Sequence, residues 1–301
     1  MLFNLGSINA DHFYDVPHLP KPGETLAATR TETGLGGKGA NQSVAAVRAG
    51  AAVRHIGAVG PDGDWAVQRL ADMGVDVRHI RKSDEPTAHA IVMVDSEGEN
   101  QIVLFPGANM DQSTEVISEA LQMGSSGDWL LLQNETSHQT EAARLAREMG
   151  MGVAYSAAPF EVRAVQDVLP YVTLLVMNEI EAQQFEQATG EAVESLPIPY
   201  VLITRGKEGA VWFDNDKDKR LNVTAFSVDS IDTTGAGDTF AGFVVAGLAL
   251  GLPVETVLRQ ASAAAALSTT KKGTADAIPN LATVLEYIAS QDTNGAFVPQ
   301  S

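Results

Sequence analysis

An aspartate preceded by small residues, in the stretch IDTTGAGDT (residues 231–239), is the part of the sequence best suited to chemistry. The apolar residues after Asp238 recur at helical spacing, so Gly235, Ala236 and Gly237 are expected at a helix N-terminus. Free backbone amides there attract an anion, and small residues let it approach closely. An ordinary helix cap would need only the aspartate. We therefore expect an anion hole suited to a transferring phosphoryl group, with Asp238 beside it to activate a nucleophile.

A second glycine-rich loop, GLGGKG (residues 34–39), precedes an expected helix at residues 39–50. It matches the dinucleotide-binding pattern only formally, because polar residues stand where that pattern requires an apolar strand. The P-loop pattern is absent, because no Gly-Lys pair is followed by Ser or Thr. Lys38 and Asn41 would supply hydrogen-bond donors to a ligand, and a plain glycine turn is the alternative.

Two further motifs have simple structural interpretations. Asn178 and Glu181, in NEIE, have the spacing of a capping box at the start of a helix. The stretch TRGKEG (residues 204–209) is typical of a turn between two strands. The six histidines show no metal-binding spacing, and there is no serine-hydrolase elbow. These features give no support to a metallohydrolase or a serine hydrolase.

The composition is that of a globular protein with a large core, because 45% of the 301 residues are hydrophobic and 19% are charged. A net charge of -18 argues against nucleic acid or an anionic membrane as a partner. The chain has no cysteine, which excludes disulfides and thiolate chemistry. Its first residues lack a basic region typical of a signal peptide, and the apolar stretch at residues 241–252 is too short to span a membrane. We expect a cytoplasmic protein.

The elements that must position these residues are predicted to form an α/β fold. Apolar runs at residues 1–6, 53–60, 128–135, 152–159, 172–179 and 200–206 show little polar alternation, so we expect strands buried on both faces of a mostly parallel sheet covered by helices. Residues 87–107 predict an antiparallel hairpin, which with residues 26–33 would form a small sheet beside the main one, a candidate lid. A single domain over residues 1–301 is expected, with a flexible tail from residue 291.

Eight motifs, taken in order along nearly the whole chain, resemble those of the ribokinase group within the PfkB family of sugar kinases. They read GSINAD, PGET, GGKGANQ, GAVGPDGD, PGAN, NEIEAQ, TRGKEG and DTTGAGDTFAGF. The resemblance implies a ribokinase-like fold, with a central, mostly parallel sheet between helices and a small β-sheet lid inserted at about residues 11–36 and 86–107. It also implies transfer of the ATP γ-phosphoryl group to O5 of D-ribose, with Mg²⁺, to give ribose 5-phosphate.

The resemblance also implies a role for individual residues. Asp238 would be the catalytic base, beside the anion hole of Gly235, Ala236 and Gly237. The sugar hydroxyls would contact Asn9, Asp11, Gly37, Lys38, Asn41, Glu135 and Asp238. ATP and Mg²⁺ would be held by Asn178, Glu181, Thr204, Arg205, Gly206, Lys207, Gly209, Gly237 and Ser262. A monovalent cation such as K⁺ would bind near Asp232, Thr234, Ser268, Lys271, Gly273 and Ala277.

The sequence departs from the family pattern at four places. Residues 156–159 read SAAP where these kinases have NPAP, Ser262 replaces a larger polar residue near adenine, and Ala277 replaces a serine in the cation site. The stretch GEAVESLPIPY (residues 190–200) contains two prolines, so a full helix is not expected there. Without a full helix at residues 190–200, part of a sheet face would be less covered, or would contact another subunit.

Several functions are compatible with these residues. The leading hypothesis is an ATP-dependent ribokinase, motivated by Asn9, Asp11, the glycine loop and Asp238. An alternative keeps the phosphoryl transfer and changes the acceptor to deoxyribose, another sugar or a nucleoside. A non-catalytic sugar or nucleotide sensor is a second alternative, and a nicotinamide oxidoreductase is the weakest. An exposed apolar lid face would favour a homodimer.

Overall fold

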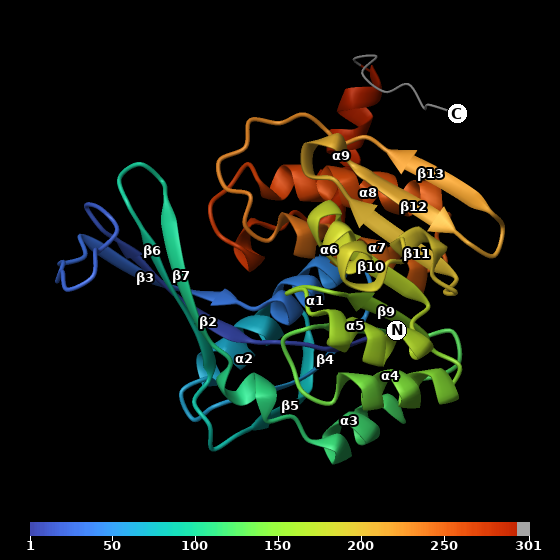
Figure 1. Cartoon of the computed structure of the whole chain (residues 1–301), viewed down its shortest axis with the longest axis horizontal. Coiled ribbons are helices and arrows are strands. Elements are labelled where there is room, and N and C mark those ends of the chain that lie inside the picture. Colours follow the sequence, from blue (N-terminus) through green and yellow to red (C-terminus); the bar gives the residue numbers. More distant parts are fainter. Residues whose placement is uncertain (294–301) are drawn as a thin grey trace.

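A nine-stranded sheet forms the centre of the computed structural model, which describes residues 1–293 (Figure 1). The strand order is β13-β12-β11-β10-β9-β8-β1-β4-β5. The six apolar runs form six of these strands and pair in parallel, which confirms their prediction. The pairs formed by β12 are antiparallel. The strands are β1 (Leu2–Leu5), β4 (Val53–Val59), β5 (Asp76–Lys82), β8 (Trp129–Gln133), β9 (Gly152–Ser156), β10 (Leu174–Asn178), β11 (Tyr200–Thr204), β12 (Ala210–Asp214) and β13 (Lys219–Val223).

Helices cover both faces of this sheet and bury a separate hydrophobic cluster on each. One cluster lies beneath α1 (Lys38–Arg48), α2 (Asp64–Asp72), α7 (Ala236–Ala249), α8 (Val254–Ser268) and α9 (Leu281–Thr293). The other lies beneath α3 (Thr114–Leu121), α4 (Gln139–Glu148), α5 (Val162–Val168) and α6 (Glu179–Thr189). Strands buried on both faces explain why the central runs of sequence are apolar without alternation.

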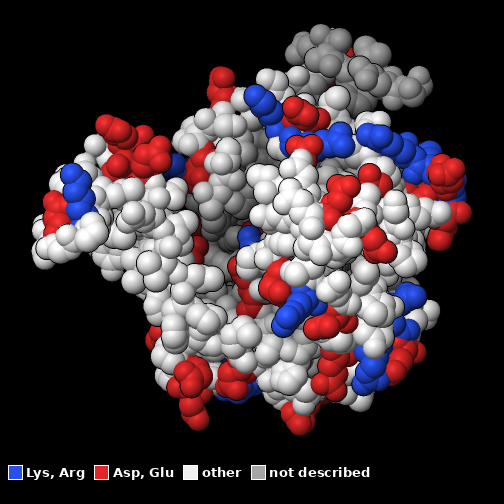
Figure 2. All heavy atoms as spheres, in the orientation of Figure 1, with Lys and Arg blue, Asp and Glu red and all other residues white. Residues whose placement is uncertain are grey.

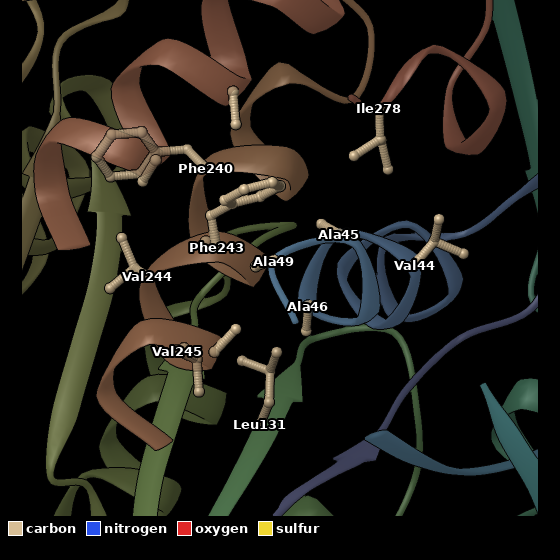
Figure 3. Packing of buried hydrophobic residues seen from close by; sticks show 14 of the residues in the cluster. Val44, Ala45, Ala46, Ala49, Leu131, Phe240, Phe243, Val244, Val245 and Ile278 are labelled. Carbon is tan, nitrogen blue, oxygen red and sulfur yellow. The ribbon is translucent and has the colours of Figure 1, made fainter. Parts of the chain in front are cut away.

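The packing of α1 against α7 matters most for the site, because both helices begin in the glycine-rich loops (Figure 3). Ala45 and Ala46 of α1 face Phe243 and Val245 of α7 across a contact made mainly of small side chains. A Cβ at Gly242 would lie 2.5 Å from the Cβ of Ala45, too close for any side chain. The glycine therefore sets the distance between the two helices.

A second, four-stranded sheet projects from the body of the molecule (Figure 1). Its order is β3 (Arg30–Gly36), β2 (Asn9–Asp15), β6 (Ala88–Val94) and β7 (Asn100–Phe105). The predicted antiparallel hairpin is confirmed as β6 and β7. Along β7, Ile102 and Val103 are each 60% exposed and Leu104 is 50% exposed, so this edge presents an uncovered apolar row.

The short segment after α6 has the predicted lack of a full helix. It contains only a 3-10 turn, η3 (Val193–Ser195). The expectation of a less covered sheet face is wrong, because Val193, Leu196 and Ile198 are buried in the cluster that also contains Val201 of β11. Three apolar side chains thus cover this part of the sheet in the absence of a full helix.

Two expectations concern the ends and surface of the chain. Residues 291–293 belong to the last turn of α9, so the expected tail does not begin at residue 291, and its remainder, residues 294–301, lies outside the described residues. Between residues 1 and 293, the structure has no helix long and apolar enough to cross a membrane.

Candidate active site

The site residues gather where the parallel strands end. Asn9 and Glu135 follow the ends of β1 and β8, and Asn178 is the last residue of β10. Helices α1 and α7 begin at the same edge of the sheet. Ligands of open α/β sheets bind at this carboxyl edge, where strand order reverses. The space-filling view shows a hollow between the small sheet and the body of the molecule, with acidic and basic atoms on its wall (Figure 2).

The carboxylate of Asp238 is held by two side chains of α1. Its Oδ2 accepts a hydrogen bond of 3.1 Å from Asn41 Nδ2, and its Oδ1 accepts one of 2.9 Å from Gln42 Nε2. The residue at the N-cap of α7 is Gly235, with φ of 74°, and no side chain caps this helix. The alternative that Asp238 is an ordinary helix cap is therefore wrong.

The residues before Asp238 form the first turn of α7, as predicted. The first amides of a helix have no carbonyl partner within it, so they are available to an anion. The amide of Ala236 makes one long contact, 3.3 Å, to the carbonyl of Thr233. A Cβ at Gly237 would meet no protein atom within 4 Å, so space lies open beside this residue. The turn therefore has helix N-terminal amides with open space beside Gly237.

Asn9 and Asp11 lie on β2, where they approach the site from the small sheet. The buried Asn9 accepts a hydrogen bond of 2.8 Å from Asn109 Nδ2, and Asn109 Oδ1 accepts one of 3.0 Å from the Ile8 amide. Asp11 lies against Gly36, where a Cβ would be 1.9 Å from Asp11 Oδ2. Burial, with a smaller contribution from the nearby Glu135 carboxylate, raises the pKa of Asp11 to about 6.

Lys38, the first residue of α1, interacts with the charges of three acids. Its pKa is raised, chiefly by Asp238 and then by Glu135 and Glu181, against the effect of burial. Glu135 Oε2 accepts a hydrogen bond of 3.1 Å from the Lys38 amide and another from the Ser7 hydroxyl. Burial raises the pKa of Glu135. The preceding Gly37 has φ of 91°, a backbone that favours glycine.

One buried acceptor of the site lacks a partner. Asn41 is 4% exposed, and its Oδ1 has no hydrogen-bond partner among residues 1–293. Its Nδ2 is already committed to Asp238. A buried carbonyl oxygen without a donor costs free energy, so this atom is suited to accept a hydrogen bond from a hydroxyl of a ligand.

Asn178 and Glu181 form the predicted capping box at the start of α6. The Asn178 amide donates to Glu181 Oε2 at 2.8 Å, and the Glu181 amide donates to Asn178 Oδ1 at 2.8 Å. Burial raises the pKa of Glu181, and the charge of Lys38 opposes that effect. Glu181 caps α6 and also acts in the site, because its negative charge raises the pKa of Lys38.

Residues 204–209 form a tight connection between β11 and β12, as the turn interpretation predicts. The sequence passes from Thr204 through the 3-10 turn η4 (Gly206–Glu208), which includes the exposed Lys207. The Arg205 amide donates to the Gly209 carbonyl at 2.7 Å. Ser262, on α8, is buried and donates its hydroxyl to the Thr224 carbonyl at 3.0 Å.

The residues that the resemblance assigns to a monovalent cation lie just before α7 and in the segment from the last residue of α8, Ser268, to the 3-10 turn η5 (Ala275–Ala277). Asp232 Oδ1 accepts from the Thr234 amide at 2.9 Å, and Asp232 Oδ2 accepts from the Gly273 amide at 3.1 Å. The hydroxyl of Ser268 donates to the Ala265 carbonyl. Lys271 is exposed and Ala277 is buried. Among the described residues there is no group of three or more His, Cys, Asp or Glu that could hold a metal ion.

Two amide residues of the site were not predicted from the sequence. Gln42 donates to Asp238, and Asn109 donates to Asn9. Both lie within motifs that were quoted, GGKGANQ and PGAN, and both are almost fully buried. A polar side chain at a buried helical position would have been the signal. Gln42 Nε2 also lies 3.4 Å from the hydroxyl of Ser156, the first residue of SAAP.

Comparison with known proteins gives one consistent result. Residues 1–281 match the family described as pfkB family carbohydrate kinase. The ribokinase of Haemophilus influenzae is 38% identical over 299 residues, covering 94% of this chain and 97% of that protein. The crystal structure of a ribokinase from Thermotoga maritima superposes with a TM-score of 0.87 at 29% identity, over 96% of this chain and 99% of that one. A structure of Arabidopsis thaliana ribokinase complexed with ribose and ATP gives 0.82 at 30% identity, covering 95% and 97%.

Proposed function

The chain belongs to the pfkB family of carbohydrate kinases, and we propose that it is an ATP-dependent ribokinase, which converts D-ribose and ATP to ribose 5-phosphate and ADP. One observation carries the proposal most directly. The Asp238 carboxylate is fixed by Asn41 and Gln42 beside a glycine-lined helix N-terminus. The charges of Lys38 and Glu135 connect it to Asp11, which lies with Asn9 on β2. A base, an anion hole and a polyol site therefore lie together.

In the proposed reaction, Asp238 accepts the proton of the sugar 5-hydroxyl as its oxygen attacks the γ-phosphorus. The bond between the γ-phosphorus and the bridging oxygen breaks, and ADP leaves with that oxygen. The amides of residues 235–237 and the positive end of α7 stabilise the charge on the transferring group. Phosphoryl transfer depends mainly on positioning and charge neutralisation, so these groups form a sufficient set.

Recognition of the sugar is assigned to side chains that suit a neutral polyol. The carboxylates of Asp11 and Glu135 accept hydrogen bonds from the sugar hydroxyls, the ammonium of Lys38 donates hydrogen bonds to them, and the unpartnered Asn41 Oδ1 accepts one. Asn9 is held in place by Asn109. A site whose buried polar atoms each pair with a hydroxyl rejects an analogue that lacks one, because an atom would then stay unpaired.

Mg²⁺ is proposed to bind with the ATP phosphates near Asn178 and Glu181. Mg²⁺ keeps several waters and needs only one or two protein carboxylates beside phosphates, which agrees with the single carboxylate of this capping box. When bound, the ion would neutralise phosphate charge. Residues 204–209 and Ser262 are proposed to line the nucleotide. The loop oxygens around Asp232 are proposed to take K⁺, which prefers oxygen ligands.

The small sheet is proposed to act as a lid over the sugar, formed by residues 11–36 and 86–107 of a single 301-residue domain. The exposed apolar row on β7 supports a homodimer formed through this lid.

A net charge of -18 supports small molecules, rather than nucleic acid or a membrane, as partners. The use of ATP and the lack of cysteine support a cytoplasmic location.

A coupled ADP-release assay tests the proposed function, with ribose, 2-deoxyribose, fructose and adenosine as acceptors. Magnesium is present throughout, and potassium is added or omitted. We expect the highest kcat/KM on ribose, formation of ribose 5-phosphate by ³¹P NMR, and faster turnover with potassium. A higher kcat/KM on another acceptor would show that this acceptor, rather than ribose, is the preferred substrate. Binding of ribose without turnover on any acceptor would instead support the sensor.

A further inference from the structure

A chain of buried polar side chains runs from Asp238 into the core of the protein. We propose that Gln42 is a positioning residue for Asp238, and that this chain fixes which end of the Gln42 amide faces the carboxylate. The inference rests on the proposed role of Asp238 as the base. The five members beyond Asp238 are fully buried, and they are Gln42, Gln133, Asn4, Ser43 and His55.

The hydrogen bonds of the chain are short and continuous. Gln42 Nε2 donates to Asp238 Oδ1 at 2.9 Å, and Gln133 Nε2 donates to Gln42 Oε1 at 2.8 Å. Gln133 Nε2 also donates to Asn4 Oδ1 at 2.9 Å. Asn4 Nδ2 donates to Ser43 Oγ at 2.8 Å, and Ser43 Oγ lies 2.8 Å from His55 Nδ1. Helix α1 and the strands β1, β4 and β8 thus all contribute to the support of one carboxylate.

Two backbone carbonyls determine the direction of every bond in the chain. His55 Nε2 lies 3.0 Å from the Gly6 carbonyl, which only accepts, so Nε2 carries the proton. Burial lowers the pKa of His55 to about 4, so the ring is neutral and its Nδ1 must accept from Ser43. Ser43 has one proton and therefore accepts from Asn4 Nδ2, which donates independently to the Gly39 carbonyl at 2.8 Å.

The same reasoning continues to the site. Asn4 presents Oδ1 to Gln133, so Gln133 must present its Nε2, and the second hydrogen of that amide goes to Gln42 Oε1. A reversed Gln133 amide would bring its oxygen against the oxygens of both neighbours. Gln42 is left with one possible orientation, with Nε2 facing Asp238. The carboxylate therefore always meets a donor and never the amide oxygen.

The donor from Gln42 makes a charge-assisted hydrogen bond to the Asp238 carboxylate, the group that is proposed to accept a proton. The charged groups that act with Asp238 are Lys38 on α1 and Glu135 after β8, and Glu181 on α6 acts on Lys38. Gln42 is fully buried, so its effect on the reaction passes through Asp238 rather than through contact with a ligand. Its second amide hydrogen is directed to Ser156 Oγ.

Two substitutions with opposite expected pH trends test the inference. Gln42→Met keeps the length of the side chain and removes one of the two side-chain donors that hold the Asp238 carboxylate. We expect kcat to fall about tenfold or more, and the acid limb of its pH profile to move to higher pH. Gln42→Glu retains a donor only while its new carboxyl is protonated. Its activity relative to the wild type should be highest at low pH, where that carboxyl is protonated, and fall as the pH rises.

Asn215→Leu is the matched control. Among residues 1–293, the side-chain amide of Asn215 donates only to the backbone carbonyls of Leu196 and Ile198, so its loss should lower the melting temperature without changing the pH profile. The KM for ATP should stay within about twofold in both Gln42 variants, because neither changes the nucleotide contacts. If Gln42→Met does not fold, the pH trend of Gln42→Glu decides.

The outcomes separate this inference from the proposed function. If the wild type turns over ribose and both Gln42 variants keep the wild-type shape of the pH profile, the inference is wrong and the proposed function stands. A wild type without turnover on any acceptor overturns the proposed function and the inference with it.

Discussion

At the residue scale, Asp238 and Asp11, two acids of the candidate site, have different environments. Asp238 is fixed by the neutral amides of Asn41 and Gln42. Asp11 is buried beside Glu135, and its pKa is raised to about 6. Acids whose surroundings differ in this way can take different roles at one pH. We assign proton transfer to Asp238 and sugar binding to Asp11.

Asp11→Asn should stabilise the unliganded protein and weaken ribose binding. Because the pKa is raised in the folded state, the ionised carboxylate costs stability as the pH rises from about 4 to 6, and the full cost is present at pH 7. Allowing for partial exposure, we expect a gain of about 1–2 kcal/mol in unfolding free energy at pH 7. Urea unfolding at pH 4 and pH 7 should show a gain only at pH 7, and the ribose KM should rise about tenfold or more. Equal stability at pH 7 would contradict the burial argument.

Gly237→Ala should lower the activity without lowering the stability of the protein. Its Cβ would meet no protein atom within 4 Å, so stability should be unchanged or raised by up to about 1 kcal/mol. The added methyl group would stand where a phosphoryl group approaches the first turn of α7, so kcat should fall about a hundredfold. Thermal unfolding and steady-state kinetics on one preparation measure both effects. Retention of full activity would remove Gly237 from the anion hole.

At the element scale, the site depends on the close contact of α1 with α7. That contact brings Asn41 and Gln42 to Asp238, although nearly 200 residues separate them along the chain. Gly242 allows the approach, since a Cβ there would also lie 2.6 Å from the Gln42 carbonyl. The packing of two helices thus sets the geometry of the base.

Gly242→Ala should reduce both stability and activity, because the new methyl group forces α1 and α7 apart. We expect a loss of about 1–3 kcal/mol in unfolding free energy. The kcat should fall while the KM for ATP changes little, since the displaced groups are Asn41 and Gln42. Gly237→Ala, on the same helix but with free space around it, is the matched control for stability. A Gly242→Ala protein as stable as the wild type would show that the helices can separate without cost.

The sequence predicted the central strands well and the edge strands poorly. Buried parallel strands such as β8 and β10 are nearly continuous apolar runs, so their type could be recognised. The edge strands β5 and β13 carry mostly charged and polar residues, DVRHIRK and KRLNV, and give no such pattern. Pairing with a neighbour, rather than local sequence, makes them strands.

The motifs predicted the residues of the candidate site, but not the buried side chains that support Asp238. Asp238 and the glycine loops have a pattern in the sequence, whereas Asn4 and Gln133 appear only as single polar residues inside apolar runs. Their role depends on contacts between segments 91 to 129 residues apart. Only the folded arrangement shows that they meet.

At the scale of the whole molecule, the small sheet leaves an apolar edge uncovered on a strongly acidic protein. Ile102 and Val103 are each 60% exposed on β7, and the chain carries a net charge of -18. Charge repulsion opposes association of two copies, so an interface must bury enough apolar surface to exceed it. A dimer of this kind would strengthen with ionic strength, because salt screens the repulsion.

The double substitution Ile102→Lys with Leu104→Lys should therefore give a monomer. Leu285→Lys, at an exposed apolar position on α9, is the control and should not change the assembly. Sedimentation velocity at low and moderate salt measures both, and the wild-type dimer should be more stable at moderate salt. A wild type that sediments as a monomer at all concentrations would contradict the proposed interface.

The central claim is that Asp238 acts as the base in phosphoryl transfer to ribose. Single-turnover formation of ribose 5-phosphate, with enzyme in excess over ATP, tests it most directly in the wild type and in Asp238→Asn. We expect the rate in the variant to fall about a hundredfold or more, with ribose and ATP still bound in equilibrium titrations. Transfer at the wild-type rate by Asp238→Asn would contradict the account.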